Sequence, residues 1–196
     1  MGKALIRRTI PSPMAKKIRV ELKDFVDEAG HVILTPIGVV HSPLDDKSEK
    51  LPFQSFASDI EGTIEVKPEF EAGLDGIEGF SHLFIVFYMH ENRKVKLRTV
   101  PLLEEEERGI FGTRSPSRPN HIGVSTVRLL SREGRKLKVK GLDVFDGTPV
   151  LDIKPYVPKD DLVQGVDNEW LVEKLEKIDS MDDKDRQKVQ RHLKGE

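Results

Sequence analysis

Hydrophobic and polar residues alternate along most of this chain with a period of two, which is typical of β-strands. Gly, Pro and Asp residues separate the alternating runs, which lie at 60–66, 82–90, 95–102, 122–130, 136–145 and 149–156. A further alternation at 18–22 is followed by turn-forming residues at 27–30 and by a β-rich run at 31–40, which predicts a hairpin. The sequence therefore predicts a mainly β fold.

One predicted strand is apolar on both faces. Residues 83–89 read Leu-Phe-Ile-Val-Phe-Tyr-Met, a pattern that is typical of a central strand covered on each side. Around it we expect a small closed β-barrel. The segment at 70–80, which contains Gly73, Gly76 and Gly79, is predicted to form a short helical turn that leads into this strand.

Helical spacing becomes clear only near the C-terminus. Asn168 can cap a helix there, and Trp170, Leu171, Leu175 and Ile178 recur at helical spacing. We therefore expect three parts: a basic N-terminal arm with the first strand in 1–30, a barrel domain in 31–158, and a charged helical extension in 159–196.

Composition narrows the class of protein. The chain has 196 residues, 37% of them hydrophobic and 34% charged, which fits one soluble domain with modest extensions. Because it contains no Cys, disulfide scaffolds, Cys-ligated metals and thiol nucleophiles are excluded. No apolar run approaches the roughly 20 residues that span a bilayer, so we expect a cytoplasmic protein with no membrane partner.

Charge is unevenly distributed. Residues 1–20 carry six Lys and Arg and no acid, whereas 159–196 carry eleven Asp and Glu against eight Lys and Arg. A polyanion should therefore approach through local basic patches rather than through the net charge of −2.

Polar residues form a first cluster at 109–125. Two prolines stiffen this segment, and Arg114 and Arg118 present forked donors that suit a carboxylate or a phosphate. The alternative is an exposed hairpin loop whose arginines pair with surface acids. Stiffness combined with Arg, Ser and Asn donors favours the binding loop.

Two further clusters follow from the same pattern. Asp143, Asp152 and Lys154 lie in strand-like apolar sequence, where a charge is costly to bury unless it meets a partner or a ligand. Asp146 and Gly147 between two strands are also explained by a simple hairpin turn. The third cluster is the end of the apolar strand, Tyr88 to Asn92, which contains His90 and is followed by the basic run at 93–98.

Several catalytic motifs are missing from the sequence. It contains no G-x-G-x-x-G after a strand, no P-loop, no G-x-S-x-G and no H-E-x-x-H, and its six His show no close metal spacing. Rossmann-type dinucleotide binding, P-loop hydrolysis, α/β-hydrolase chemistry and zinc proteolysis are therefore poor interpretations, and we expect no metal.

Four segments together resemble a known family. They read TPIGVVHSP at 35–43, GFSHLFIVF at 79–87, FGTRSPSRPNHIGVS at 111–125 and DGTPVLDIKPY at 146–156. In this order they resemble the TsaA-like proteins, also called the TrmO family. The resemblance implies a small β-barrel that binds S-adenosylmethionine, works as a homodimer and methylates N6 of threonylcarbamoyl-adenosine beside the tRNA anticodon.

The same resemblance implies a set of cofactor contacts. These are Phe53, Gln54, Ser55, His90, Glu91, Arg114, Val124, Asp143, Asp146, Gly147 and Thr148. Family members often carry Arg-Gln-Pro where this chain has 53–55, so Gln54 is the shared residue of the three.

These residues suit the chemistry of the cofactor. The forked donor Arg114 matches the carboxylate of S-adenosylmethionine, and Asp143 or Asp146 and the Tyr88 ring match its sulfonium. The backbone at 122–124 can cover the adenine. Positioning provides most of the rate for methyl transfer from an activated sulfonium.

Acceptor contacts are hypotheses at this point. Because a carbamoyl group makes the remaining N6 proton more acidic, a modest base or a polarising Lys suffices, and the candidates are Asp152, Lys154 and Tyr156. The candidates for contact with the tRNA anticodon loop are Arg93, Lys94, Arg118 and Asn120. Two alternatives remain open: a non-catalytic RNA-binding barrel, and a methyltransferase with a small-molecule acceptor.

Overall fold

The computed structural model describes residues 26–44, 59–101 and 106–166. Contacts divide the chain into two compact units, Met1–Leu34 and Thr35–Glu196, which we describe separately. The predicted strand at 18–22, the predicted helix from Asn168 and the expected cofactor contacts Phe53, Gln54 and Ser55 lie outside the described residues.

The described part of the first unit is a tight turn. Asp27 accepts hydrogen bonds on its carboxylate from the backbone N–H groups of Ala29 and His31, at 3.0 and 2.8 Å, and Gly30 supplies a φ of +84°. A bridge between Val26 and Val32 closes it. The predicted turn at 27–30 is therefore confirmed.

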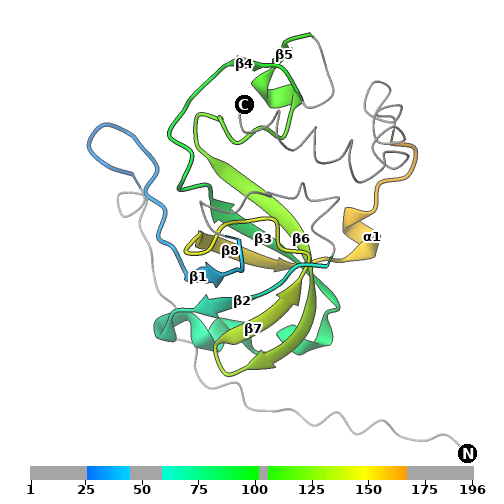
Figure 1. Ribbon diagram of the computed structural model, residues 1–196. Coiled ribbons are helices and arrows are strands. Elements are labelled where there is room, and N and C mark those ends of the chain that lie inside the picture. Colours follow the sequence, from blue (N-terminus) through cyan, green and yellow to red (C-terminus); the bar gives the residue numbers. More distant parts are fainter. Residues whose placement is uncertain (1–25, 45–58, 102–105, 167–196) are drawn as a thin grey trace, which may run out of the picture. The chain divides into compact units, whose positions relative to one another are not determined.

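The second unit is built on six antiparallel strands that form a closed barrel (Figure 1). The barrel strands are β1 (Gly38–His41), β2 (Glu61–Val66), β3 (His82–Tyr88), β6 (Ile122–Glu133), β7 (Lys136–Lys140) and β8 (Pro149–Pro155). Around the barrel their order is β1-β2-β7-β6-β3-β8. This confirms the predicted mainly β fold and the closed barrel.

The barrel core is formed by the side chains that point inward from alternate strand positions. In β3, Leu83, Ile85 and Phe87 are buried, whereas the outward residues Phe84 and Val86 are half-buried. β3 pairs with β6 on one side and with β8 on the other, so its central place is confirmed. Its outward face is only partly covered, contrary to the expectation of a strand covered on both sides.

Three predicted strands are shorter in the structure. The run at 31–40 contributes only β1 from Gly38 onward, because Pro36 has no N–H to donate to a ladder. The run at 136–145 ends at Lys140, because Gly141 turns the backbone with a φ of +95°.

The third shortened strand lies in the predicted run at 95–102. It contributes only β4 (Arg98–Thr99), which pairs with β5 (Arg108–Gly109). Just before β4, the backbone bonds to other segments: Lys96 donates to the Ser117 carbonyl at 3.0 Å. The alternation at 95–97 therefore does not correspond to a ladder.

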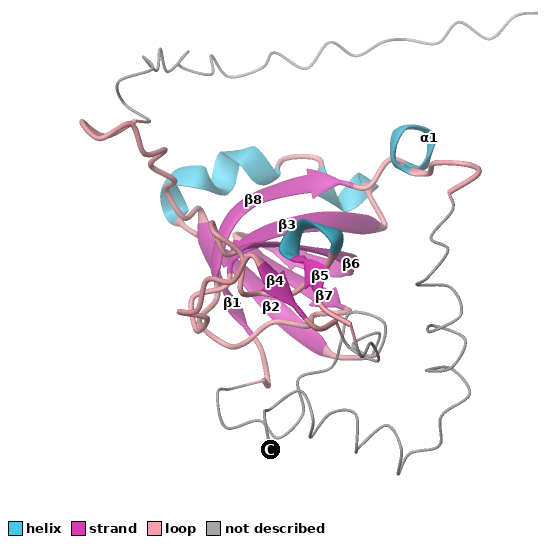
Figure 2. Ribbon diagram, turned by 90° about the horizontal axis from the view of Figure 1, so that it is seen from above, coloured by secondary structure: helices cyan, strands magenta, loops and turns pink. Residues whose placement is uncertain are grey.

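The helices are short and lie around the strands of the barrel (Figure 2). The 3-10 helices η3 (Pro68–Leu74) and η4 (Ile77–Gly79) lead into β3, which confirms the predicted helical turn at 70–80. A third 3-10 helix, η5 (Ile110–Gly112), lies with β4 and β5 beyond the other end of β3 (Figure 1). One short helix, α1 (Pro158–Asp161), follows β8.

Arg132 holds the η3–η4 end to the β6–β7 hairpin. Its guanidinium donates to the Gly134 and Leu74 carbonyls at 2.7 and 2.8 Å and to the Glu78 carboxylate at 3.0 Å. These three contacts tie η3, η4 and the β6–β7 turn together at this end of the barrel.

A glycine in β2 allows a close approach of β1. A Cβ on Gly62 would lie 2.6 Å from the His41 carbonyl oxygen and 2.5 Å from Leu142 Cδ1.

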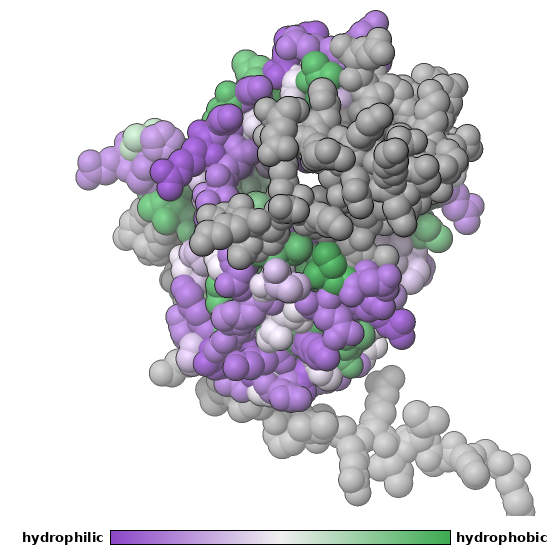
Figure 3. Space-filling model, viewed as in Figure 1, coloured by the Kyte–Doolittle hydropathy of each residue, from purple (hydrophilic) through white to green (hydrophobic). Residues whose placement is uncertain are grey.

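On the face shown in Figure 3, hydrophilic residues cover most of the barrel, and hydrophobic residues show as small separate patches between them.

Candidate functional site

A partly buried carboxylate lies at the barrel end where β3 finishes. Asp143 follows β7, and its Oδ1 accepts a hydrogen bond of 2.5 Å from the hydroxyl of the inward-facing Ser125 in β6. Burial raises the pKa of Asp143, and the hydrogen bond from Ser125 and the positive charge of Arg114 act in the opposite direction. The two expected cofactor contacts, Arg114 and Asp143, are thus close enough to interact.

His90, which follows β3, contacts Thr148, which precedes β8. Thr148 is 2% exposed, and its Oγ1 lies 3.5 Å from Nδ1 of His90, which follows β3. The other ring nitrogen of His90 lies 3.1 Å from the Glu91 carboxylate. The structure therefore joins the two segments that the sequence proposed separately, the end of the apolar strand and the start of β8.

The turn before β8 is tied to the end of β1. Asp146 accepts a hydrogen bond of 3.0 Å from the backbone N–H of Ser42. Gly147, with a φ of +74°, donates its N–H to the Val40 carbonyl at 2.9 Å. Asp146 and Gly147 thus form the turn that the sequence predicted. This turn is hydrogen-bonded to the end of β1.

The loop at 113–121 is hydrogen-bonded within itself. Ser115 donates its N–H to the Thr113 hydroxyl at 3.2 Å, and Ser117 donates its N–H to the Ser115 hydroxyl at 3.4 Å. Arg118 Nη1 donates to the Thr113 and Ile110 carbonyls at 2.7 and 3.3 Å. These bonds, with the two prolines, support the predicted stiff loop, and they give Arg118 a role inside it.

The basic run after β3 lies along this loop. Asn92 donates its side-chain amide to the Ser117 hydroxyl at 3.4 Å, and His121 Nε2 lies 3.1 Å from the Lys94 carbonyl. The side chains of Arg93 and Lys94 are exposed. The first and third polar clusters of the sequence therefore form one surface.

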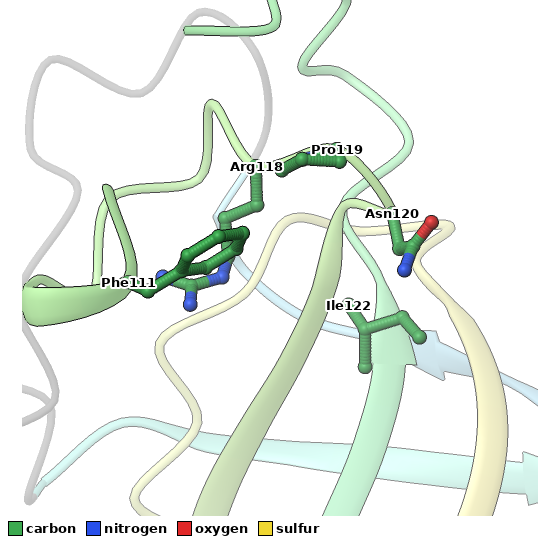
Figure 4. Close-up of a pocket in the computed structure, with 5 residues that line it drawn as sticks. All are labelled: Phe111, Arg118, Pro119, Asn120 and Ile122. Atoms are coloured by element: carbon green, nitrogen blue, oxygen red, sulfur yellow. The ribbon is translucent and has the colours of Figure 1, made fainter. Parts of the chain in front are cut away.

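A hollow of about 240 Å³ opens on this surface. It is lined by Phe111, Arg118, Pro119, Asn120 and Ile122 (Figure 4). Two of the residues expected to contact RNA, Arg118 and Asn120, line it.

The three acceptor-site candidates lie on the outer face of the barrel. Asp152 pairs with Val86, and Lys154 pairs with Phe84, both of which point outward from β3. Lys154 Nζ lies 2.7 Å from the Asp152 carboxylate, which raises the pKa of Lys154. The Tyr156 ring packs edge-on against Phe84 with ring centres 5.4 Å apart.

One expected cofactor contact, Val124, lies on the outer face of the barrel. Val124 in β6 is paired with Val86, which is paired on its other side with Asp152, so the three residues form a row across the sheet. Asp143, in contrast, bonds to an inward-facing side chain. The structure thus does not bring Asp152, Lys154 and Tyr156 to the partly buried carboxylate, and it places Asp152 on the same face as Val124.

Sequence reasoning missed two residues of this region. Ser125 is 2% exposed, and a polar residue at an inward strand position was a signal that a buried partner exists. Phe111 is 76% exposed, and the sequence pattern could not distinguish this ring from one in the core.

Among the residues that the structure describes, no group of three or more His, Asp or Glu side chains could hold a metal ion.

Comparison with known proteins identifies the family. The tRNA-methyltransferase O N-terminal domain family matches residues 39–162. The chain belongs to the tRNA-methyltransferase O family. The family match begins at the second residue of β1 and ends just after α1, so it spans all of the barrel except Gly38.

Relatives of this chain carry names that point to a cofactor and to a substrate. A protein of Pyrococcus abyssi named "Probable S-adenosyl-L-methionine-binding protein" is 45% identical over 152 residues, which cover 77% of this chain and 82% of that protein. A mouse protein named "tRNA (adenine(37)-N6)-methyltransferase" is 36% identical and covers 71% of this chain and 34% of its own length.

A solved TrmO structure supports the same barrel. The crystal structure of TrmO from Pseudomonas aeruginosa matches with a TM-score of 0.59 and 37% identity, over 71% of this chain and 62% of that one. This chain therefore spans about three fifths of that TrmO.

Among the described residues, none of the helices is long and apolar enough to cross a membrane.

Proposed function

We propose that this protein transfers a methyl group from S-adenosylmethionine to N6 of an adenine in tRNA, and that the acceptor is threonylcarbamoyl-adenosine in the anticodon loop. The observation that carries the proposal is the opposite charge pair at the barrel end, Arg114 and Asp143, within a TrmO-family fold. The family resemblance adds that the active form is a homodimer.

The residues at the barrel end fit the cofactor. S-adenosylmethionine combines a carboxylate with an ammonium and a sulfonium, so it needs a cation and an anion placed close together. Arg114 offers a forked donor for the carboxylate, and Asp143 offers a negative charge for the positive groups. Because Asp143 is partly buried, its charge is less screened by water than that of a fully exposed carboxylate.

When bound, the cofactor supplies a methyl group that is already activated for displacement, so the protein's main task is positioning. The hydrogen bond from Ser125 fixes the Asp143 carboxylate, and the stiff loop at 113–121 fixes Arg114. The Gly147 turn and the buried Thr148 hold the wall of the site against β1.

The outer-face residues suit the acceptor. The nearby Asp152 carboxylate keeps Lys154 protonated by raising its pKa, so Lys154 serves as a cation rather than as a base. Such a cation pairs with the threonyl carboxylate of the acceptor. Asp152 lies in one row with Val124, the expected cofactor contact on the same outer face, and in this assignment it takes the N6 proton. The Tyr156 ring, packed against Phe84, offers an aromatic surface on that face.

Two other functions share some of these features. A non-catalytic RNA-binding barrel would use the exposed Arg93 and Lys94 without needing Asp143, since a partly buried carboxylate repels phosphate. A small-molecule methyltransferase would need Arg114 and Asp143 but not the basic surface. Cofactor binding and acceptor choice therefore separate the three.

The first experiment measures cofactor binding by calorimetry in metal-free buffer. Arg114→Ala should weaken S-adenosylmethionine binding by about 10- to 140-fold, because a hydrogen bond to a charged group contributes about 1.5–3 kcal/mol. Arg128→Ala, which removes an exposed Arg of β6, is the matched control and should bind normally. Equal affinity in wild type and both variants would contradict this cofactor site.

The second experiment compares tRNA from cells with and without the threonylcarbamoyl modification as methyl acceptor. Wild type should methylate only the modified tRNA, and Lys154→Ala should lose most of that activity while the exposed-lysine control Lys159→Ala keeps it. Equal methylation of both tRNAs would reject the proposed acceptor, and full activity of Lys154→Ala would remove that lysine from the mechanism.

A further inference from the structure

We propose that the hollow lined by Phe111, Arg118, Pro119, Asn120 and Ile122 is a subsite for one unpaired base of the RNA, which stacks on Phe111 and bonds to Asn120. This base is a neighbour of the methylated adenine in the anticodon loop. The inference rests on the proposed function for the identity of the RNA, and it assigns Phe111 a role that the sequence did not indicate.

Phe111 is presented to solvent on a firm support. The residue is 76% exposed, whereas the preceding Ile110 is 1% exposed and anchors the short helix η5 in the protein. The Arg118 guanidinium lies 5.8 Å from the Phe111 ring centre. Since Arg118 is itself held by two backbone carbonyls, it fixes the ring from one side and leaves a preorganised stacking platform.

The opposite side of the hollow offers hydrogen bonds. The side-chain amide of Asn120 has no hydrogen-bond partner among the described residues, and it carries both a donor and an acceptor. An Asn amide pairs with the N6 and N7 edge of adenine, so the hollow suits a purine. Figure 4 shows Phe111 and Asn120 on either side of the Arg118–Pro119 segment.

The size of the hollow fits a single base. Its volume of about 240 Å³ is below the about 300–1,000 Å³ of pockets that enclose drug-sized ligands. A purine base is smaller than such ligands, and stacking leaves one of its faces outside. An entire nucleotide would extend beyond the hollow onto the surrounding surface.

That surrounding surface carries the cations that a phosphodiester chain needs. Arg93, Lys94 and Lys96 are exposed, and within the described part of the chain none of them forms an ion pair. The bonds of Asn92 and Lys96 to Ser117 hold this segment against the loop that carries Arg118 and Asn120. A base in the hollow would therefore have its backbone phosphates beside these exposed basic side chains.

The cofactor's adenine is a weaker candidate for this hollow. The groups that fit the cofactor's charges are Arg114 and Asp143, which accepts a hydrogen bond from the inward-facing Ser125, whereas Phe111 is the most exposed of the large hydrophobic residues described. The target adenine of the RNA is also a weaker candidate. If Asn120 bonded to its N6, the reacting edge of the base would be occupied, so the bound base is better assigned to a neighbour of the target.

The test measures binding of an anticodon stem-loop RNA by fluorescence anisotropy without cofactor. Stacking on an aromatic side chain contributes enough that Phe111→Ala should weaken binding about 5- to 140-fold, whereas Phe111→Trp should retain it. Phe70→Ala is the matched control, since Phe70 also lies exposed on a 3-10 helix. A fully paired hairpin of equal charge should bind wild type and Phe111→Ala equally.

Three companion measurements make the result decisive. Calorimetry should give the same S-adenosylmethionine affinity for Phe111→Ala and wild type, and thermal unfolding should give the same Tm. The stem-loop should also quench the added indole emission of Phe111→Trp relative to wild type, which has one Trp.

Each contrary result overturns a defined claim. If Phe111→Ala binds the stem-loop as wild type does while wild type methylates tRNA, the base subsite is wrong and the proposed function stands. If Phe111→Ala loses cofactor affinity, the hollow holds the cofactor's adenine and the inference fails. If wild type binds the stem-loop through Phe111 but methylates no tRNA, the subsite stands and the proposed function fails.

Discussion

Gly62 in β2 is the position where a single methyl group should have the clearest effect on the fold. Alanine there would place its Cβ 2.6 Å from the His41 carbonyl oxygen and 2.5 Å from Leu142 Cδ1. Both distances are well inside van der Waals contact. The His41 oxygen belongs to the backbone of β1, so it can move only if the β1–β2 pairing moves.

The size of the effect follows from two opposing contributions. Adding a methyl group to a tightly packed position typically costs about 1–3 kcal/mol. Replacing Gly by Ala also restricts the unfolded chain, which returns about 0.4–1 kcal/mol. Because a backbone oxygen is involved, we expect Gly62→Ala to lower the free energy of unfolding by about 1–2.5 kcal/mol, or Tm by about 2–10 °C.

The matched control is Gly73→Ala in η3, where a Cβ would have no neighbour within 4 Å. Thermal and urea unfolding of both variants measure the difference. Gly62→Ala should also weaken S-adenosylmethionine binding, because displacement of His41 disturbs the Ser42 N–H that bonds to Asp146. A Gly62→Ala protein as stable as wild type, at an unchanged urea m-value, would refute the argument from close approach.

Three further predictions concern charge. Burial raises the pKa of Asp143, and cofactor affinity should fall as pH is lowered through that pKa, because the protonated carboxyl no longer attracts a cation. Calorimetry across pH should show this fall for wild type. Asp143→Asn should bind weakly at every pH. Arg132→Ala should lower the unfolding free energy by about 1–3 kcal/mol, since it leaves the Leu74 carbonyl without its donor, yet leave cofactor affinity unchanged; a loss of affinity would show that the two barrel ends are coupled. Deleting residues 1–16 removes four Lys and Arg, and should make the salt dependence of tRNA binding shallower by up to about 2.8 in the log–log slope, whereas an unchanged slope would show that the arm does not contact phosphate.

Much of the barrel could be predicted because its determinants are local. The apolar run of β3 identified the central strand, and the Gly and Asp turns identified most strand ends. Strand length was harder to predict, because alternation at 95–97 and 142–145 reflects side chains that contact other segments rather than a ladder. Whether a backbone group bonds to the neighbouring strand or to a distant loop depends on tertiary packing.

The separation of the site into two faces could not be predicted for a specific reason. From the buried Val150, strict alternation would point Asp152 inward. The register shifts between Val86 and Phe87, so that Phe87 pairs with Val150 and Val86 pairs with Asp152. This bulge turns Asp152 and Lys154 to the outer face, and a bulge of this kind leaves no clear mark in the sequence.

The seam that closes the barrel is also the wall of the candidate site. β1 and β8 meet only at Gly38 with Val150 and Val39 with Pro149, and the backbone bonds of Val40 to Gly147 and Thr148 extend this short contact. The same few backbone bonds therefore close the sheet and hold the turn at Asp146 and Gly147 in place. A change that opens this seam would release that turn from β1 and so disturb the candidate site as well as the barrel.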